Sequence, residues 1–501
     1  MAQELTDVHS PHQREIIVAA LDRHDVFVQA ATAFGKSLCF QLPAVIDNGS
    51  KSPRGLGRRP LAPLRRGGYS LTGIVTIVVS PLLSLMMNQV EILQGAGVDA
   101  RTLNSHTLPA ERDRIHQDLA SGHPHTRLLY VTPELCSTGG FRRRLVVVHE
   151  QRELARIVVD EAHCISEWGH DFRRDFKRLS WFRDTFPDVP IMCLTATATP
   201  LVRRDVLSTL GLDRAPDRVR TFTMSAFRPN LHLEIRYTSD EADDRFDDFV
   251  GWLQQVHARR ADDADRRREL EAAGERADGV AGIIYTISRD ECEMLAAALR
   301  REGVGARPFH ARLTQPAKEE TLARWIRGDK GWDVIVATTA FGMGIDKENV
   351  RFVVHWRLPK SFEGYYQEAG RAGRDGKAGY CFLYYSREDG NRVLSMISRD
   401  SGPREPAAGG GGGGGGGASS NKEARLQSLA KLVEYCEDTG GCRHAAVCKY
   451  FGEAAVPACD FACDWHKDPE GLPKRQRQGL ADEAWVSTQQ QEGAFEDCWD
   501  D

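Results

Sequence analysis

Short apolar and β-branched runs alternate with longer helix-like stretches over most of the chain, from residue 26 to residue 397. Such alternation predicts parallel β-sheets that are covered by helices. A polar, charge-dense stretch at 239–279, which we expect to be mostly a solvated helix, separates two groups of strands. The expected strands are 26–29, 74–80, 128–132, 157–160 and 191–195 in the first group, and 282–286, 333–338, 352–355 and 379–385 in the second. The pattern therefore predicts an α/β protein with two parallel-sheet lobes.

The segments outside the two groups of strands differ from them in composition. Residues 51–72 carry six basic residues and no acidic ones among several Gly and Pro, which predicts an inserted surface loop. Nine consecutive glycines at 409–417 predict a flexible linker, and an acidic tail with three consecutive glutamines predicts disorder. The expected domains are two lobes at 1–225 and 226–400, a linker at 401–420, a separate small module at 421–468 and a disordered tail at 469–501.

Composition and charge narrow the classes of protein. The longest mostly apolar run, 73–87, is interrupted by polar residues and falls short of the ~18 to 20 apolar residues that a membrane span needs. The first residues lack the features of a secretory signal, so we expect a protein of the nucleus or cytosol with no membrane partner. In such a reducing compartment the twelve cysteines are expected to stay free of disulfides. The net charge of -5 indicates that any nucleic-acid site is a local groove.

A candidate phosphate-binding loop follows the first expected strand. Residues 30–37 read AATAFGKS and lead into an apolar helix-like stretch. In that setting the N–H groups of a helix N-terminus hold phosphate oxygens, Lys36 adds charge at the β- and γ-phosphates, and Ser37 can bind Mg²⁺. The loop departs from G-x-x-x-x-G-K-[ST] at its first position, Ala30, and Gly-Lys-Ser after a strand also occurs by chance. By itself the loop leaves a nucleotide site and a chance match open.

Two further motifs supply the charged groups that phosphoryl transfer needs. The fourth expected strand ends in Asp160 and Glu161, of which the first can hold Mg²⁺ and the second can orient and deprotonate water. Gln367, Arg371 and Arg374 fall on one face at helical spacing, although two glycines in this segment argue for a short or strained helix. Guanidinium groups brought from the second lobe would stabilise transition-state charge. An acidic turn and a basic surface turn are the alternatives, and the presence of all three motifs favours phosphoryl transfer.

Together these motifs resemble the superfamily 2 helicases, and their details are similar to the RecQ family of ATP-dependent DNA helicases. The most specific segment is the aromatic-rich loop at 160–173, which reads DEAHCISEWGHDFR. Further matching segments are 80–85, 131–134, 194–199, 227–230, 282–285, 340–347 and 367–376. The resemblance spans most of 13–466 and implies two RecA-like lobes followed by a small helical zinc-binding module.

The resemblance implies a role for each residue that matches a family motif. It makes Gln13 the reader of the adenine edge, Glu161 the general base and His163 a coupling residue near the γ-phosphate. Arg371 and Arg374 would be arginine fingers. Thr195 and Thr197 would link the nucleotide site to DNA movement. The full set assigned to ATP and Mg²⁺ comprises Gln13, Thr32, Gly35, Lys36, Ser37, Asp160, Glu161, His163, Gln367, Arg371 and Arg374.

The resemblance also implies a set of residues that bind DNA. Trp168 and Phe172 would stack on bases and Arg173 would add a charged contact. Stacking on an aromatic side chain is worth ~1 to 3 kcal/mol per base and tolerates any sequence, which suits a motor that steps along DNA. Core packing is the alternative role for both aromatic residues. The full set assigned to DNA comprises Ser80, Thr132, Trp168, Phe172 and Arg173.

Five cysteines crowd between residues 436 and 463, and His466 follows them. This cluster is similar to the zinc-binding subdomain of RecQ proteins, although its last ligand position holds His where the family has Cys. The resemblance implies one zinc ion per chain, and neutral imidazole is an accepted zinc ligand. Buried thiols without metal are the alternative, and Cys436, His444 and Cys448 are rival ligands. The expected ligands are Cys442, Cys459, Cys463 and His466.

The resemblance implies an enzyme that uses ATP and Mg²⁺ to move 3′ to 5′ along single-stranded DNA and to unwind duplexes in recombination and repair. Its partners would be single-stranded and tailed duplex DNA. The 35 residues beyond His466 are fewer than the ~80 that a winged helix needs, so we expect no such domain. A DNA-stimulated ATPase or annealing factor that unwinds poorly is therefore an alternative. An RNA helicase and a relative disabled by its insertion at 51–72 are two more.

Overall fold

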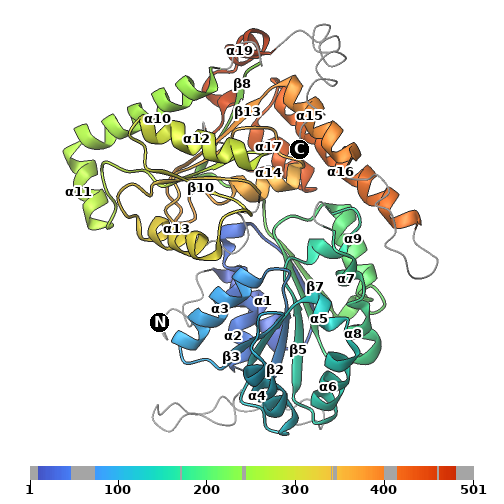
Figure 1. Cartoon of the computed structure of the whole chain (residues 1–501). Coiled ribbons are helices and arrows are strands. Elements are labelled where there is room, and N and C mark those ends of the chain that lie inside the picture. The colour runs from blue at the N-terminus through green and yellow to red at the C-terminus, as the bar shows by residue number, and fades with distance from the viewer. Residues whose placement is uncertain are drawn as a thin grey trace. The chain divides into compact units, whose positions relative to one another are not determined.

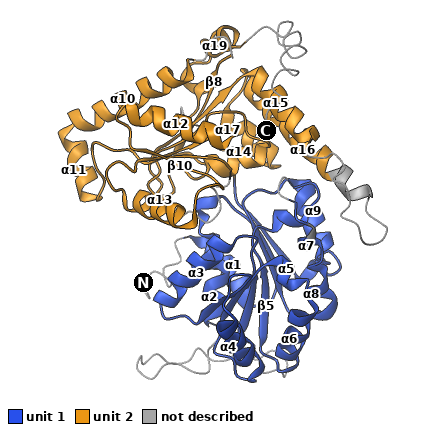
Figure 2. Ribbon diagram, in the orientation of Figure 1, with its two compact units in different colours: residues 1–225 blue, residues 226–501 orange. Residues whose placement is uncertain are grey.

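The structure is a computed structural model that describes residues 10–46, 74–169, 172–239, 244–339, 341, 347–399, 415–459 and 462–480, without the side chains of 174 and 415–420. The expected basic loop at 51–72, the expected linker as far as residue 414 and the tail beyond residue 480 lie outside these residues. The chain divides into two compact units, Met1–Ser225 and Ala226–Asp501 (Figure 2). None of the helices in the described ranges has the length and apolar character to cross a membrane.

Unit 1 is built on a sheet with helices on both sides (Figure 1). Its seven strands lie in the order β3-β4-β2-β5-β6-β1-β7, and all strand pairs are parallel. The central five strands are buried along their whole length, because helices cover both faces of the sheet. The sequence pattern predicts these five and misses the two edge strands, which carry polar, partly exposed residues. The strands are β1 (Asp25–Gln29), β2 (Val75–Val79), β3 (Ala100–Leu103), β4 (Leu128–Val131), β5 (Leu154–Val159), β6 (Ile191–Thr195) and β7 (Val219–Thr223).

Alternate side chains of each strand point to opposite faces, so the sheet of unit 1 separates two cores. Val26 and Val28 join one core, whereas Phe27 joins the other. The first core is covered by α1 (Pro11–Leu21), α2 (Lys36–Ile46) and α3 (Leu83–Gly95). The second is covered by α4 (Pro109–Ala120), α5 (Pro133–Cys136), α6 (Gly139–Glu150), α7 (Arg174–Lys177), α8 (Ser180–Thr185) and α9 (Pro200–Thr209).

Unit 2 contains a six-stranded sheet in the order β10-β11-β9-β12-β13-β8, again with every pair parallel. The predicted strands match β9, β11, β12 and β13, while β8 and β10 at the two edges were not predicted. The strands are β8 (Leu231–Tyr237), β9 (Gly282–Tyr285), β10 (Ala306–Phe309), β11 (Val334–Ala337), β12 (Phe352–His355) and β13 (Gly379–Tyr385).

The helices of unit 2 also form two layers on its sheet. One core contains residues of α10 (Arg245–Asp262) and α12 (Arg289–Arg301), and α11 (Ala264–Ala272) follows α10. The other core is shared by α13 (Gln315–Arg327), α14 (Phe362–Ala369), α15 (Arg387–Arg399), α16 (Gly415–Glu437) and α17 (Arg443–Tyr450). The small helices α18 (Asp464–Lys467) and α19 (Leu472–Gly479) follow. The region expected to be a separate module at 421–468 thus shares a core with the second lobe.

The stretch at 239–279 is helical and largely exposed over its described residues, as expected, although α10 buries Phe249 and Leu253 against the sheet. The structure differs from the sequence predictions at two other segments of unit 2. Helix α16 begins at Gly415, so the last glycines of the expected linker are helical and continue a helix that packs on the core further along. Helix α19 lies in the tail expected to be disordered. Leu472 is buried there, and the Gln476 side-chain amide donates to the Glu437 carbonyl at 2.7 Å.

Candidate nucleotide site and metal centre

The candidate phosphate loop joins β1 to α2 in unit 1. A short 3₁₀ turn, Thr32–Phe34, leads to Gly35, whose φ of 76° lies in the left-handed region. A Cβ at Gly35 would also meet the Nε2 atom of Gln13 at 2.7 Å, so both conformation and space favour glycine. Lys36 Nζ donates to the carbonyls of Ala30 and Ala31 at 3.0 and 3.2 Å. The loop therefore closes around the lysine that would meet the phosphates.

Gln13 lies against this loop and is almost fully buried, with 3% of its surface exposed. Its Nε2 donates to the Phe34 carbonyl at 2.8 Å, and its Oε1 accepts the Ser10 N–H at 3.2 Å as part of a capping box at the start of α1. The sequence assigned this amide to the adenine edge. In the structure the amide joins the first helix to the phosphate loop.

Ser37, the expected magnesium ligand in the loop, accepts a hydrogen bond from Gln89 Nε2 at 3.1 Å. Gln89 lies on α3 and is mostly buried. Sequence reasoning missed this residue, although the matching segment 80–85 runs into the same helix and ends four residues before Gln89. The structure thus adds Gln89 as the side chain that orients the Ser37 hydroxyl.

The acidic pair lies where β5 ends. The Asp160 N–H donates to the Val79 carbonyl of the neighbouring strand, and the Asp160 carboxylate accepts the Glu161 N–H at 3.0 Å. Glu161 has a φ of 49°, an uncommon left-handed conformation for a residue with a side chain. Burial, reinforced by the Glu161 carboxylate, raises the pKa of Asp160 to about 7, and the opposite charge of Lys36 limits that rise.

Asp160 and Ser37 offer oxygen donors, which are the ligands that Mg²⁺ prefers. A buried carboxylate with a raised pKa is also a group that a divalent cation would return to its charged form. The donor chemistry of these two residues therefore fits magnesium.

A polar chain connects the acidic pair to the neighbouring strand. His163 Nδ1 lies 3.4 Å from Glu161 Oε2 and 3.0 Å from the Thr195 hydroxyl at the end of β6. That hydroxyl also accepts the Thr197 N–H at 3.1 Å. The Thr195 carbonyl accepts the Ala30 N–H of the phosphate loop at 3.1 Å. The structure thus brings the predicted Glu161, His163, Thr195 and Thr197 into one group of polar contacts beside the loop.

The residues expected to bind DNA have defined contacts in unit 1. The Arg173 guanidinium donates to the carbonyl of Pro81 at 3.0 Å, next to the buried Ser80. Trp168 is partly buried against the unit 1 core, and its N–H donates to the Ser166 hydroxyl at 3.2 Å. The structure therefore brings Arg173 to the Ser80 segment and anchors Trp168 at the core surface.

Two further expected DNA contacts lie in the same unit. The Phe172 ring has Lys177 Nζ 5.7 Å from its centroid. The Thr132 hydroxyl caps α5 by accepting the Leu135 N–H at 3.3 Å. Both contacts are structural in this state, and DNA binding by these residues stays a prediction.

The segment at 370–376, named here the arginine turn, carries Arg371 and Arg374 in unit 2. The prediction that Gln367, Arg371 and Arg374 share one helical face is wrong, because α14 ends at Ala369 and the arginines lie in the turn beyond it. Gly373 has a φ of 55°, which a helix cannot accommodate. Arg371 is buried, with 5% of its surface exposed. The turn conformation therefore decides where both guanidinium groups point.

Four side chains at the end of unit 2 form a candidate metal centre. The ligand atoms of Cys442, Cys459, Cys463 and His466 all lie within 4.8 Å of one another. Cys463 Sγ is 3.2 Å from His466 Nδ1 and 4.0 Å from Cys442 Sγ. Three thiol groups and one imidazole form a donor set that fits tetrahedral zinc. The structure thus brings together the four ligands expected from the sequence.

The rival ligands occupy other positions in the described part of the chain. Cys436 and Cys448 belong to the hydrophobic core, where burial raises the pKa of the Cys436 thiol. His444 lies beside the centre, with its Nδ1 3.4 Å from Cys459 Sγ, and its Nε2 bonds to the Arg228 carbonyl at 3.1 Å. His444 is therefore a neighbour of the four-residue group.

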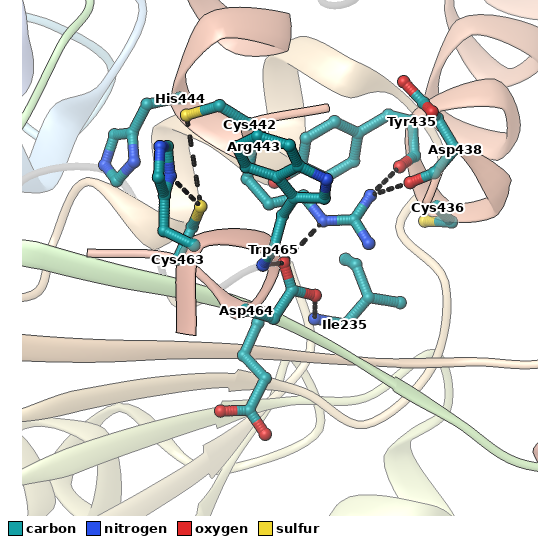
Figure 3. A network of polar contacts seen from close by, with 12 residues as sticks. Ile235, Tyr435, Cys436, Asp438, Cys442, Arg443, His444, Cys463, Asp464 and Trp465 are labelled. Carbon is teal, nitrogen blue, oxygen red and sulfur yellow. Dashed lines mark hydrogen bonds and ion pairs between the residues drawn. The ribbon is translucent and has the colours of Figure 1, made fainter. Parts of the chain in front are cut away.

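A buried ion pair fastens the metal centre to the sheet (Figure 3). Arg443 Nε lies 2.8 Å from Asp464 Oδ1, and one guanidinium nitrogen donates to the Tyr435 and Asp438 carbonyls, both at 2.6 Å. The second Asp464 oxygen accepts the Ile235 N–H of β8 at 3.0 Å. The two charged residues immediately follow Cys442 and Cys463. Sequence reasoning missed this pair, although a charged residue beside each of two ligands was an available signal.

Comparison with known families places each part of the chain. Residues 10–204 match the DEAD/DEAH box helicase family, 266–376 match the helicase conserved C-terminal domain, and 387–467 match the RecQ zinc-binding family.

Individual helicases are also similar to this chain in sequence or in fold. ATP-dependent DNA helicase Q5 of Rattus norvegicus is 38% identical over 471 residues, 93% of this chain and 42% of the relative. RecQ-like DNA helicase BLM of Xenopus laevis is 38% identical over 443 residues, 88% of this chain and 28% of the relative. The chain thus spans less than half the length of these two relatives. The solved structure of the DUF1998 helicase MrfA bound to DNA covers 77% of this chain and 50% of its own, with a TM-score of 0.55 and 15% identity, and shows the shared fold.

Proposed function

The chain belongs to the RecQ helicase family, and from that membership we propose that it is an ATP-dependent DNA helicase that moves 3′ to 5′ on single-stranded DNA. The observation that carries the proposal is the group formed by Lys36, Asp160 and Glu161 at one end of the unit 1 sheet. Phosphoryl transfer needs a charge on the phosphates, a carboxylate for the metal and a base for water, and these residues supply all three. The similar proteins named as DNA helicases support DNA as the partner.

In this proposal the residues of unit 1 bind and activate ATP. The N-terminus of α2 and Lys36 hold the phosphates, and Ser37 and Asp160 hold Mg²⁺, which supplies Lewis-acid charge stabilisation when bound. Glu161 orients the attacking water and accepts its proton. His163 contacts both Glu161 and Thr195, so a change in the charge or position of the Glu161 carboxylate reaches the end of β6.

The proposal gives unit 2 two tasks. Arg371 and Arg374 stabilise the charge of the transition state during turnover. The zinc centre holds α17 and α18 on the sheet, since zinc that binds only the folded ligand set stabilises the fold. The described contacts of Arg371 are compatible with this role, because its burial keeps the guanidinium in a fixed environment.

ATP turnover with and without single-stranded DNA tests the proposal first. We expect strong stimulation by DNA, weaker stimulation by RNA of the same length, and loss of turnover in Lys36→Ala. The Arg300→Ala variant is the control, because Arg300 donates to the Ala306 carbonyl far from these motifs. Equal stimulation by RNA would favour an RNA helicase, and no turnover by folded chain would overturn the assignment.

Strand displacement then tests direction and unwinding. We expect a duplex with a 3′ single-stranded tail to be separated and a duplex with a 5′ tail to persist, each with ATP and Mg²⁺. DNA-stimulated turnover without displacement of either duplex would favour the alternative of a translocating or annealing factor. A nuclear role in recombination and repair is part of the proposal, and imaging of the tagged full protein tests that location.

A further inference from the structure

The segment Phe227-Arg228-Pro229-Asn230 at the start of unit 2 carries a motif for which the proposed reaction gives no role. Its arginine contacts the arginine turn. One guanidinium nitrogen of Arg228 donates to the Gly370 carbonyl at 3.2 Å, and the other donates to the carbonyls of Ala372 and Gly373 at 3.1 and 2.9 Å. A single side chain therefore satisfies three carbonyl groups of the segment that holds Arg371 and Arg374.

Asn230 strengthens the same attachment. Its Nδ2 donates to the carbonyls of Gly373 and Lys377, both at 2.8 Å. A Cβ on Gly373 would lie 2.5 Å from that nitrogen and from the Lys377 carbonyl, so the turn packs tightly on the motif. The carbonyls at a helix C-terminus have no partner within the helix, and here the motif supplies those partners.

The backbone of the motif is held in turn by residues of the metal-binding region. The Arg228 carbonyl accepts a hydrogen bond from His444 Nε2 at 3.1 Å, and the Phe227 ring lies edge-on to the His444 ring at 5.1 Å. The other His444 nitrogen is 3.4 Å from the thiol of Cys459 in the candidate metal centre. Arg228 thus lies between that centre and the arginine turn.

We propose that Arg228 is a positioning residue for ATP hydrolysis, which holds the arginine turn against the metal-binding region and so places Arg371 and Arg374. This inference rests on the proposed function, because it takes the two arginines as the groups that stabilise the transition state. A planar guanidinium can donate in several directions at once, whereas a lysine ammonium cannot reproduce the same fork. The position therefore requires arginine and tolerates lysine poorly.

The first test is the kinetics of Arg228→Lys and Arg228→Ala in the full chain with single-stranded DNA. We expect kcat for ATP turnover to fall on the order of 100-fold, because a small misplacement of a charge-stabilising group has that effect. The KM for ATP and the zinc content should stay at the values of the unaltered chain, since neither the phosphate loop nor the metal ligands change. In Arg228→Ala, added methylguanidinium should restore part of kcat by binding to the three exposed carbonyls.

Arg300→Ala is the matched control, since Arg300 also donates to a main-chain carbonyl in unit 2 but contacts no part of the arginine turn. It should keep its kcat and should not respond to methylguanidinium. An unchanged kcat in Arg228→Lys would overturn the proposal. A parallel loss of zinc and kcat would also overturn it, because Arg228 would then act as a general support of unit 2.

Amide hydrogen exchange separates this proposal from the proposed function. The amides at 370–376 should exchange faster in Arg228→Lys, while those of α12 keep the rates of the unaltered chain. If the unaltered chain shows no ATP turnover, the proposed function fails and the exchange result still decides whether Arg228 holds the turn. Unchanged exchange at 370–376 would contradict the positioning role even in an active enzyme.

Discussion

The phosphate loop of unit 1 and the arginine turn of unit 2 each contain a glycine of positive φ close to a helix, but they are held in different ways. In the phosphate loop Lys36 donates to carbonyls only five and six residues away, and Gln13 and the Thr195 carbonyl add bonds from farther along the chain. The arginine turn is held by Arg228, which is 142 to 145 residues away. The first site is a contiguous motif that closes partly on its own carbonyls, whereas the carbonyls of the arginine turn meet the Arg228 side chain only once unit 2 has folded.

The largest expected effect is on ATP turnover and concerns the phosphate loop. Lys36→Ala should lower ATP turnover on the order of 1000-fold or more, because it removes the charge that faces the phosphates. The thermal unfolding of unit 2 and the zinc content should stay unchanged, since Lys36 and the carbonyls to which it donates belong to unit 1. Steady-state turnover, calorimetry and elemental analysis measure these quantities, and a large fall in the stability of unit 2 would mean that the substitution acts through the fold rather than at the phosphates.

The second prediction concerns the candidate metal centre of unit 2. Cys463→Ser should lower the zinc content and destabilise unit 2, because the thiol lies at the centre of the candidate metal group and beside β8. The amides of the arginine turn should then exchange faster, whereas the amides of α2 in unit 1 should keep their protection. Elemental analysis and hydrogen exchange measure these changes. Full zinc content in Cys463→Ser would contradict the assigned ligand set.

The third prediction concerns the ion pair beside the metal centre. Arg443→Met should destabilise unit 2 by about 3 to 5 kcal/mol, because it leaves the Asp464 carboxylate buried without its partner. The double variant Arg443→Met with Asp464→Leu should regain much of that loss, since it removes both buried charges. Denaturant unfolding followed by a unit 2 tryptophan measures the difference. A double variant as unstable as the single variant would mean that the ion pair itself supplies the stability.

The fourth prediction isolates one contact of the phosphate loop. Gly35→Ala should destabilise unit 1 by roughly 1 to 2 kcal/mol, because alanine is strained in the left-handed conformation of this position. The added Cβ should also displace Gln13 and so raise the KM for ATP. Gly97→Ala is the matched control, because Gly97 has a similar φ of 81° and open space around a Cβ. Equal KM values in the two variants would show that the contact between Gly35 and Gln13 has no part in nucleotide binding.

The smallest expected effect is a pH dependence at Asp160, measured with a chelator and without nucleotide. The folded-state pKa of this carboxyl is raised to about 7, so the folded chain binds an extra proton between the unfolded pKa and pH 7. Stability from this group is therefore complete at low pH and is lost as the pH rises toward 7. Asp160→Asn should remove that loss and raise the melting temperature at pH 8 by a few degrees. An unchanged pH profile would contradict the raised pKa.

Sequence pattern predicted the parts of the fold that are buried on both sides. Nine of the strands were predicted because continuous apolar runs are typical of central parallel strands. The edge strands β3 and β7 were missed, since their exposed polar residues lack that pattern. The prediction of a solvated helix holds for most of 239–279, and only the packed sheet shows that α10 has a narrow face that is buried.

The candidate site divides in the same way. The phosphate loop, the acidic pair and the four expected metal ligands could be named from short motifs, because each motif places its chemistry within a few residues. Gln89 and Arg443 were not named, since no local pattern shows that they contact Ser37 and Asp464. The helical reading of the arginine segment failed because Gly370 and Gly373 end α14 early.

By itself the sequence determined the fold class, the family and the chemical groups available to it, because apolar periodicity and contiguous motifs are local properties of the chain. Only the tertiary structure decided how those groups are held. In the folded chain Gln13 bonds to the phosphate loop and Arg228 bonds to the carbonyls of the arginine turn. The metal-binding region shares a hydrophobic core with the second lobe. The physical reason is that hydrogen bonds to main-chain carbonyls and shared cores join residues that are distant in sequence, and no local pattern records such contacts.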